Sequence, residues 1–131
     1  MEIVLRKKYM KKFAYKLIDT AGQITGVVTN LFSKNQRADL ARDIMLANQR
    51  IEQVGFLTWA KNYNSPAKFT MMGDELCING TLAAGYLVSQ KTGLTDVAVA
   101  TSGLNNLVKI SRTGNLVSAT FPDLVHQNDR R

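Results

Sequence analysis

The segment FTMMGDELCINGT, residues 69–81, takes the chain from an extended apolar run, through a break at Gly73, to the expected start of a helix. Cys77 lies at that start. A helix N-terminus carries about half a positive charge and several N–H groups without an intrahelical partner, so it binds carboxylates and phosphates. It also favours the thiolate form of a nearby cysteine. Cys77 is therefore a candidate base or nucleophile beside an anion site.

Two features qualify this interpretation of Cys77. Asn79 and Gly80 follow it closely, and a small residue such as glycine lets a ligand approach the backbone. A lone cysteine is also commonly a small buried residue of a core helix. Both readings of Cys77, as a site residue and as a core residue, stay open on the sequence.

The residues after Cys77 predict a helix over 78–91 that is apolar on nearly every face. Its centre reads LAAGYLV, residues 82–88, and Gly93 is placed to end it. A helix of this kind is usually enclosed by other elements. We therefore expect it to lie at the centre of the domain.

The rest of the chain reads as about seven short strands and one further helix. Ser33 is the expected N-cap of that helix, whose apolar stripe includes Leu40, Ala41 and Ile44. The strands are expected at residues 13–18, 24–29, 52–60, 68–72, 95–101, 106–111 and 116–121. The predicted fold class is α+β, with a curved mixed sheet wrapped around the central apolar helix.

The chain has 131 residues, the size of one domain, and its composition narrows the function classes. Its one cysteine and one histidine, His126, exclude an internal disulfide framework and a multi-cysteine zinc site, so we expect no metal. No apolar run approaches the ~18 residues that a membrane span needs. These features predict a cytoplasmic protein without membrane contact.

The formal net charge of +7 is concentrated at the two ends. Residues 1–12 and 129–131 hold seven basic and two acidic residues, whereas residues 13–128 hold ten basic and eight acidic ones. We therefore expect a basic N-terminal extension at 1–12, a folded domain at 13–122 and a polar C-terminal tail at 123–131. Because the body is nearly neutral, nucleic acid is not the expected partner.

Three motifs in order carry a resemblance to a known family. EQVGFL at 52–57 and MGDELCING at 72–80, preceded by AGQIT at 21–25, resemble the N-terminal half of the diaminopimelate epimerase-like superfamily. Its members are cofactor-independent amino-acid racemases and epimerases. Within the superfamily, the nearest pattern is that of the staphylopine-pathway histidine racemases. The resemblance spans about residues 13–120 and implies one half of a diaminopimelate epimerase-like fold.

The resemblance implies a two-base mechanism without pyridoxal phosphate or any other cofactor. In that family one cysteine thiolate removes the α-proton of the amino acid, and a second cysteine reprotonates the opposite face. Carried over to this chain, Cys77 is the catalytic acid/base. The substrate-binding positions are Ile78, Asn79 and Gly80 at the helix start, with Gln53 and Gln23 as polar contacts. The implied ligand is a small amino-acid-like carboxylate.

The chain departs from that family's pattern in two ways. It holds no second cysteine, and Ile78 replaces the glycine that usually follows the first one. Because C2 dimers are the commonest homo-oligomers, a homodimer could face two Cys77 thiols across one cleft. The sequence thus predicts a racemase- or epimerase-like homodimer. The alternative is a non-catalytic carboxylate-binding module on the same half-fold.

Overall fold

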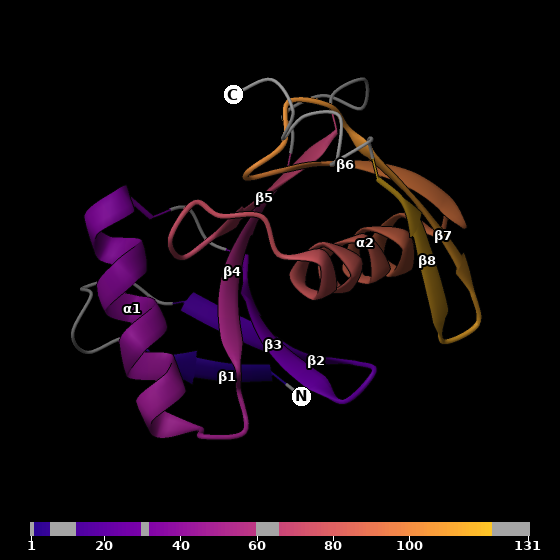
Figure 1. Cartoon of the computed structure of the whole chain (residues 1–131). Coiled ribbons are helices and arrows are strands. Elements are labelled where there is room, and N and C mark those ends of the chain that lie inside the picture. Colours follow the sequence, from indigo (N-terminus) through magenta and orange to yellow (C-terminus); the bar gives the residue numbers. More distant parts are fainter. Residues whose placement is uncertain (1, 6–12, 30–31, 60–65, 122–131) are drawn as a thin grey trace.

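The computed structural model describes residues 2–5, 13–29, 32–59 and 66–121. They form eight strands and two helices in one sheet-and-helix arrangement (Figure 1). In chain order the elements are β1 (Glu2–Leu5), β2 (Phe13–Thr20), β3 (Gln23–Val28), α1 (Lys34–Ala47), β4 (Gln53–Thr58), β5 (Ala67–Met71), α2 (Ile78–Thr92), β6 (Asp96–Thr101), β7 (Val108–Thr113) and β8 (Leu116–Thr120).

The strands lie in the sheet in the same order as in the sequence, from β1 to β8. The pairs β3–β4 and β5–β6 are parallel, and all other neighbouring pairs are antiparallel. Each parallel pair is connected through a helix. Since β5 and β6 run opposite to β3 and β4, crossovers of one hand put α1 and α2 on opposite faces of the sheet.

Helix α2 lies inside the curl of the sheet and contacts every strand from β2 to β8 (Figure 1). The core on this side contains the buried side chains of Leu57, Phe69, Ala84, Val99 and Ile110. The enclosure explains why α2 carries so few polar side chains along its middle. The predicted fold class, a curved mixed sheet around a central apolar helix, is confirmed.

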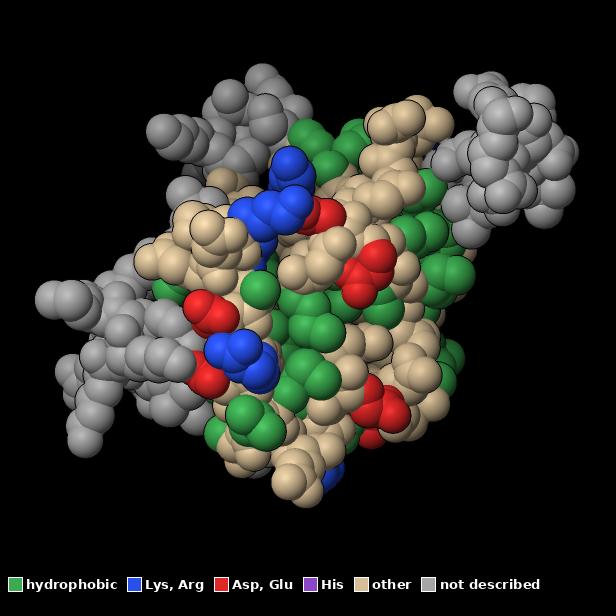
Figure 2. All heavy atoms as spheres, turned by 60° about the vertical axis from the view of Figure 1, so that its left-hand side comes forward, with side chains coloured by type: hydrophobic (Ala, Val, Ile, Leu, Met, Phe, Trp, Pro, Cys, Tyr) green, Lys and Arg blue, Asp and Glu red, His purple; other side chains and the backbone are tan. Residues whose placement is uncertain are grey.

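Helix α1 covers the outer face of the first strands. It begins at Ser33 with a capping box, in which Ser33 Oγ accepts from Gln36 N and Gln36 Oε1 accepts from Ser33 N. Its buried residues Leu40, Ala41 and Ile44 pack in the second core. Figure 2 turns this side forward and shows hydrophobic side chains between acidic and basic ones. A shallow hollow there is lined mainly by Ala38, Met45, Leu46 and Met72.

The most N-terminal strand was not expected from the sequence. Residues 2–5, inside the segment 1–12 that we expected to be an extension, form β1 and pair with β2. The expected tail at 123–131, which includes His126, lies outside the described residues. Neither helix of the described part is both long and apolar enough to cross a membrane.

Candidate functional site

Cys77 is the N-cap residue of α2. Its backbone is extended, and its Sγ accepts a hydrogen bond from Gly80 N at 3.2 Å. The backbone N–H groups of Ile78 and Asn79, in the first turn, have no carbonyl four residues back within the helix. The partly buried thiol and these donors therefore lie together at the positive end of α2.

One of the predicted polar residues, Gln23, reaches this helix start from β3. Asn79 Nδ2 donates to Gln23 Oε1, which connects the first turn of α2 to the beginning of β3. Gln23 follows a tight hairpin turn in which both Ala21 and Gly22 have positive φ angles, of 52° and 91°. Within this turn, Gly22 N donates a hydrogen bond to Asp19 Oδ1 at 2.9 Å.

Gln53 lies one strand further into the sheet. Its Nε2 donates to the hydroxyl of Thr25 at 2.8 Å, and Thr25 is fully buried. Thr25 is the register partner of Gln53, and it shares a face of β3 with Gln23 because side chains alternate along a strand. Gln53 is therefore on the same face as α2. Its amide is engaged by Thr25 and has no direct bond to Cys77 or Asn79.

The start of α2 rests on the ring of Phe69. A Cβ at Gly55 would lie 2.1 Å from Phe69 Cζ, and a Cβ at Gly80 would lie 3.1 Å from Phe69 Cε2. The same Gly80 position would be 3.3 Å from Cys77 Sγ. Two glycines thus leave room for one aromatic ring between β4 and the first turn of α2, and this packing fixes the height of Cys77 above the sheet.

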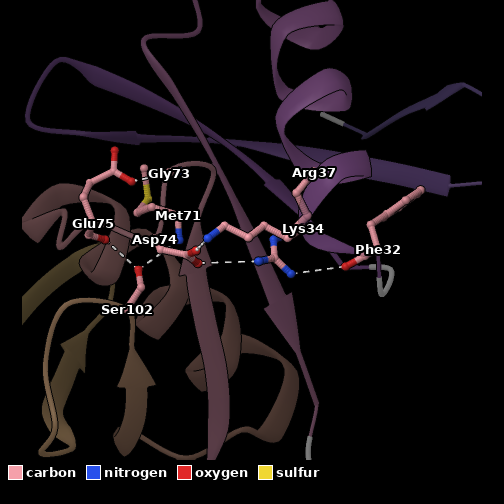
Figure 3. Close-up of polar contacts among 8 residues, drawn as sticks. All are labelled: Phe32, Lys34, Arg37, Met71, Gly73, Asp74, Glu75 and Ser102. Carbon is pink, nitrogen blue, oxygen red and sulfur yellow. Dashed lines mark hydrogen bonds and ion pairs between the residues drawn. The ribbon is translucent and has the colours of Figure 1, made fainter.

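The loop after β6 supports the turn that precedes Cys77. Ser102 Oγ donates to the carbonyl of Glu75 at 2.6 Å and accepts from Met71 N at 3.0 Å (Figure 3). Gly103 approaches Leu76 so closely that a Cβ would lie 2.6 Å from its backbone nitrogen. Nothing in the spacing of Ser102 indicates this bridge, so it could not be predicted from the sequence.

Thr81 fixes the other side of the same turn. Its hydroxyl donates to the Cys77 carbonyl at 2.7 Å and shares a hydrogen bond of 3.0 Å with Thr101 Oγ1. Both threonines are buried. The backbone of Cys77 is therefore held from within α2 and from β6 at once.

Of the predicted site residues, Cys77, Ile78, Asn79, Gly80 and Gln23 come together at one end of α2. Ile78 is 47% exposed, so its side chain points outward and does not fill the core. Gln53 shares their face of the sheet but bonds within it. In the part of the chain that the structure describes, no three His, Cys, Asp or Glu side chains gather as a metal-binding group.

An open groove of about 900 Å³ runs along α2 from Asn79 to Gln90, between β2 and β8. It is lined by both apolar and polar side chains, among them Leu82, Tyr86 and Lys16. Cys77 does not line it. Asn79, in the first turn of α2, is thus the candidate-site residue of that turn that also lines the groove.

Comparisons with known proteins agree with this architecture. A search of curated proteins found no match. Among solved structures, a protein of Clostridium difficile (strain 630) named for phenazine biosynthesis, PhzC/PhzF, superposes with a TM-score of 0.62 at 16% identity. The match covers 80% of this chain and 42% of that one, so it shows a shared fold over less than half of the longer protein.

The sequence itself matches a family profile described as the histidine racemase CntK N-terminal domain, over residues 15–120. That range runs from β2 to the end of β8 and includes every residue of the candidate site. The match confirms the expected N-terminal half of a racemase-like superfamily. This chain belongs to the histidine racemase CntK N-terminal domain family.

Proposed function

We propose that this domain supplies one half of a cofactor-independent amino-acid racemase or epimerase site, with Cys77 as its acid/base. The observation that carries the proposal is the N-cap position of Cys77, where the thiol and the first-turn N–H groups of α2 face the same region. Family membership supports the reaction type, since the matched profile is named for a histidine racemase.

The chemistry needs a base, an acid and donors for the substrate carboxylate. The Cys77 thiolate would take the α-proton, and the electron pair left on the α-carbon would spread onto the carboxylate. Backbone donors of Ile78 and Asn79 would bind that carboxylate and stabilise its growing charge. A second thiol would then donate a proton to the opposite face, which inverts the configuration of the α-carbon. At the end Cys77 is a thiol and the second cysteine is a thiolate.

The second thiol is proposed to be Cys77 of a second copy of this chain. A C2 axis through the open side of the α2 start would bring two thiols and two helix N-termini to one cleft. The exposed Ile78 side chain would lie at that contact. The arrangement requires no cysteine beyond the one in the sequence.

Exchange of the α-proton tests the proposed chemistry directly. L-Histidine, followed by a panel of other amino acids, is incubated with the protein in heavy water, and the α-proton signal is followed by NMR. We expect loss of this signal together with formation of the D-isomer, and neither with Cys77→Ala. Equal rates with the protein and with Cys77→Ala would contradict the role of Cys77.

Mild oxidation tests the composite site separately. A disulfide needs α-carbons within about 7 Å, so two facing Cys77 thiols should crosslink rapidly and without unfolding. The Cys77→Ser protein serves as the control for non-specific crosslinking. A folded protein that resists crosslinking would contradict the facing arrangement.

The alternative function is a carboxylate-binding module without racemase activity. It is favoured by the same first-turn donors together with the single cysteine, because the two-base inversion needs a second thiol that one chain does not hold. It predicts saturable binding of an amino acid, measured by calorimetry, with no α-proton exchange. Binding by the unchanged protein without exchange would support this alternative, whereas exchange that is lost in Cys77→Ala would contradict it.

A further inference from the structure

The turn between β5 and α2 carries two acidic residues, Asp74 and Glu75, three and two positions before Cys77. Asp74 adopts a positive φ of 61°, a conformation that Asp and Asn tolerate better than most residues. Its carboxylate is directed toward α1, where Oδ2 lies 3.2 Å from Lys34 Nζ and Oδ1 lies 3.5 Å from Arg37 Nη2 (Figure 3). The turn is thus connected by charge to the first turns of α1.

Arg37 is the more firmly held of the two basic partners. Its side chain is 19% exposed, against 77% for Lys34, and its Nη1 donates to the carbonyl of Phe32 at 3.2 Å. Arg37 Nε is buried and has no hydrogen-bond partner among the residues that the structure describes. A guanidinium held by packing and by a backbone carbonyl loses less freedom on pairing than a solvated lysine does.

The second acidic residue is held within the turn itself. Glu75 Oε1 accepts from Gly73 N at 3.0 Å, while the Glu75 carbonyl accepts from Ser102 Oγ. Figure 3 shows the Asp74 and Glu75 side chains pointing in different directions from the turn. A further acidic group, Asp19 of β2, accepts from Gly22 N in the hairpin beside Asn79.

We propose that Arg37 is a positioning residue for Cys77. By pairing with Asp74, Arg37 fixes the turn that leads into α2 and holds its negative charge toward α1, away from the thiol. Lys34 adds a weaker, solvent-screened contribution to the same carboxylate. The effect of Arg37 on Cys77 does not require the racemase function. Its importance for catalysis does rest on that proposed function.

The test is the pH dependence of alkylation of Cys77 by iodoacetamide, with no substrate present. The ratio of the rates at pH 7 and pH 9.5 reports the thiolate fraction and cancels changes in access to the sulfur. For Arg37→Ala we expect this ratio to fall about threefold, because the released carboxylate of Asp74, three positions before Cys77, disfavours the thiolate. Lys34→Ala should change the ratio less than Arg37→Ala does.

Asp74→Asn gives the matched reversal, because asparagine also tolerates the positive φ. Combined with Arg37→Ala it should restore the ratio, and alone it should leave the ratio unchanged or raise it. A merely structural role for Arg37 would lower thermal stability without this reversal. An unchanged ratio in Arg37→Ala, or a double variant as impaired as Arg37→Ala, would overturn the proposal. If Arg37→Ala does not fold, a lower ratio in Asp74→Asn would overturn it.

The α-proton exchange assay separates this inference from the proposed function. If the protein exchanges no α-proton while the alkylation ratios follow the expected pattern, the racemase proposal fails and the role of Arg37 stands. If exchange occurs and Arg37→Ala leaves both the alkylation ratio and the exchange rate unchanged, the racemase proposal stands and the proposed role of Arg37 fails.

Discussion

Phe69 connects the sheet to the residue that matters most for the proposed chemistry. Its ring fills the space over Gly55 and under Gly80, so any added atom at Gly55 must displace the ring. Since Phe69 is fully buried, the ring has nowhere to go without moving β4 or the start of α2. The position of Cys77 thus depends on the absence of a side chain at Gly55 in β4.

Gly55→Ala is therefore expected to destabilise the protein by about 1–3 kcal/mol, the usual cost of overpacking a core. Gly26→Ala, in the adjacent strand β3, is the matched control, because its Cβ would meet only ordinary contacts of 3.6 Å or more. Urea denaturation measures both. Similar losses in the two variants would contradict the assigned role of the ring.

Tyr15 gives a prediction for alkaline pH. It is 2% exposed, and its burial raises the pKa of its hydroxyl above the ordinary value of 10.0. In the unfolded chain it ionises first, so its contribution to the free energy of unfolding is full below about pH 10 and is lost as the pH rises through the folded-state pKa. The unfolding free energy of the wild type should fall more steeply above pH 10 than that of Tyr15→Phe. Parallel curves from pH 8 to 11.5 would refute this.

The sequence predicts some of these residue-scale features and not others. The position of Cys77 at the start of α2 could be predicted because the signals are local. The extended run ends at Gly73, and a small residue and an apolar helix follow it. The contact of Arg37 with Asp74 joins residues 37 positions apart, and no local pattern encodes it. The Ser102 bridge escapes prediction for the same reason.

At the scale of elements, α2 lies unusually close to β7. A Cβ on Gly85 would be 2.2 Å from Cδ1 and 2.6 Å from Cγ2 of Ile110, which is itself 1% exposed. Glycine in the middle of a helix costs about 1 kcal/mol relative to alanine. Here it allows the helix to pack against the strand at a distance that a methyl group would prevent.

Gly85→Ala should therefore destabilise the protein by about 1–3 kcal/mol despite the better helix former. In an Ile110→Ala background the same substitution should cost clearly less, since the clashing atoms beyond Cβ are gone. Thermal or urea unfolding of the four proteins completes a double-mutant cycle. A cost that does not depend on the background would mean that Ile110 is not the obstacle.

Most elements follow from the sequence because their signals are local. The Ser33 cap and the Gly93 end of α2 are both found where the pattern predicts them. Strand β1 was not predicted because charge dominates its surroundings, and pairing with β2 decides its structure. The order of strands in the sheet also lies beyond periodicity, since it depends on long-range pairing.

At the scale of the whole molecule, the proposed function depends on self-association at the start of α2. Ile78 is 47% exposed there, and Leu46, at 68%, is exposed on α1, on the other face of the sheet. Either position accepts a charge without opening the core. The position at which a charged residue dissociates the dimer therefore identifies the contact surface.

Ile78→Asp is expected to shift a dimer to monomer at micromolar concentration, whereas Leu46→Asp should leave the dimer intact. Sedimentation equilibrium measures both, with circular dichroism as the check on folding. Dissociation by Leu46→Asp alone would place the contact on α1 and would remove the support for two facing thiols. At this scale the family could be predicted from short motifs in the sequence. The surface that contacts a second copy could not be predicted, because a self-complementary surface has no characteristic sequence pattern.

The agreement between strand order and chain order has a consequence for how the protein folds. Every strand from β2 to β7 pairs with the strand before it and the strand after it, so each new pairing closes only a short loop or one helical crossover. Closure of short loops costs little entropy, and a topology built from near neighbours folds fast for a β-rich domain. The sheet can therefore grow from one edge as the polypeptide leaves the ribosome, because each strand can pair with the strand before it as soon as both have emerged.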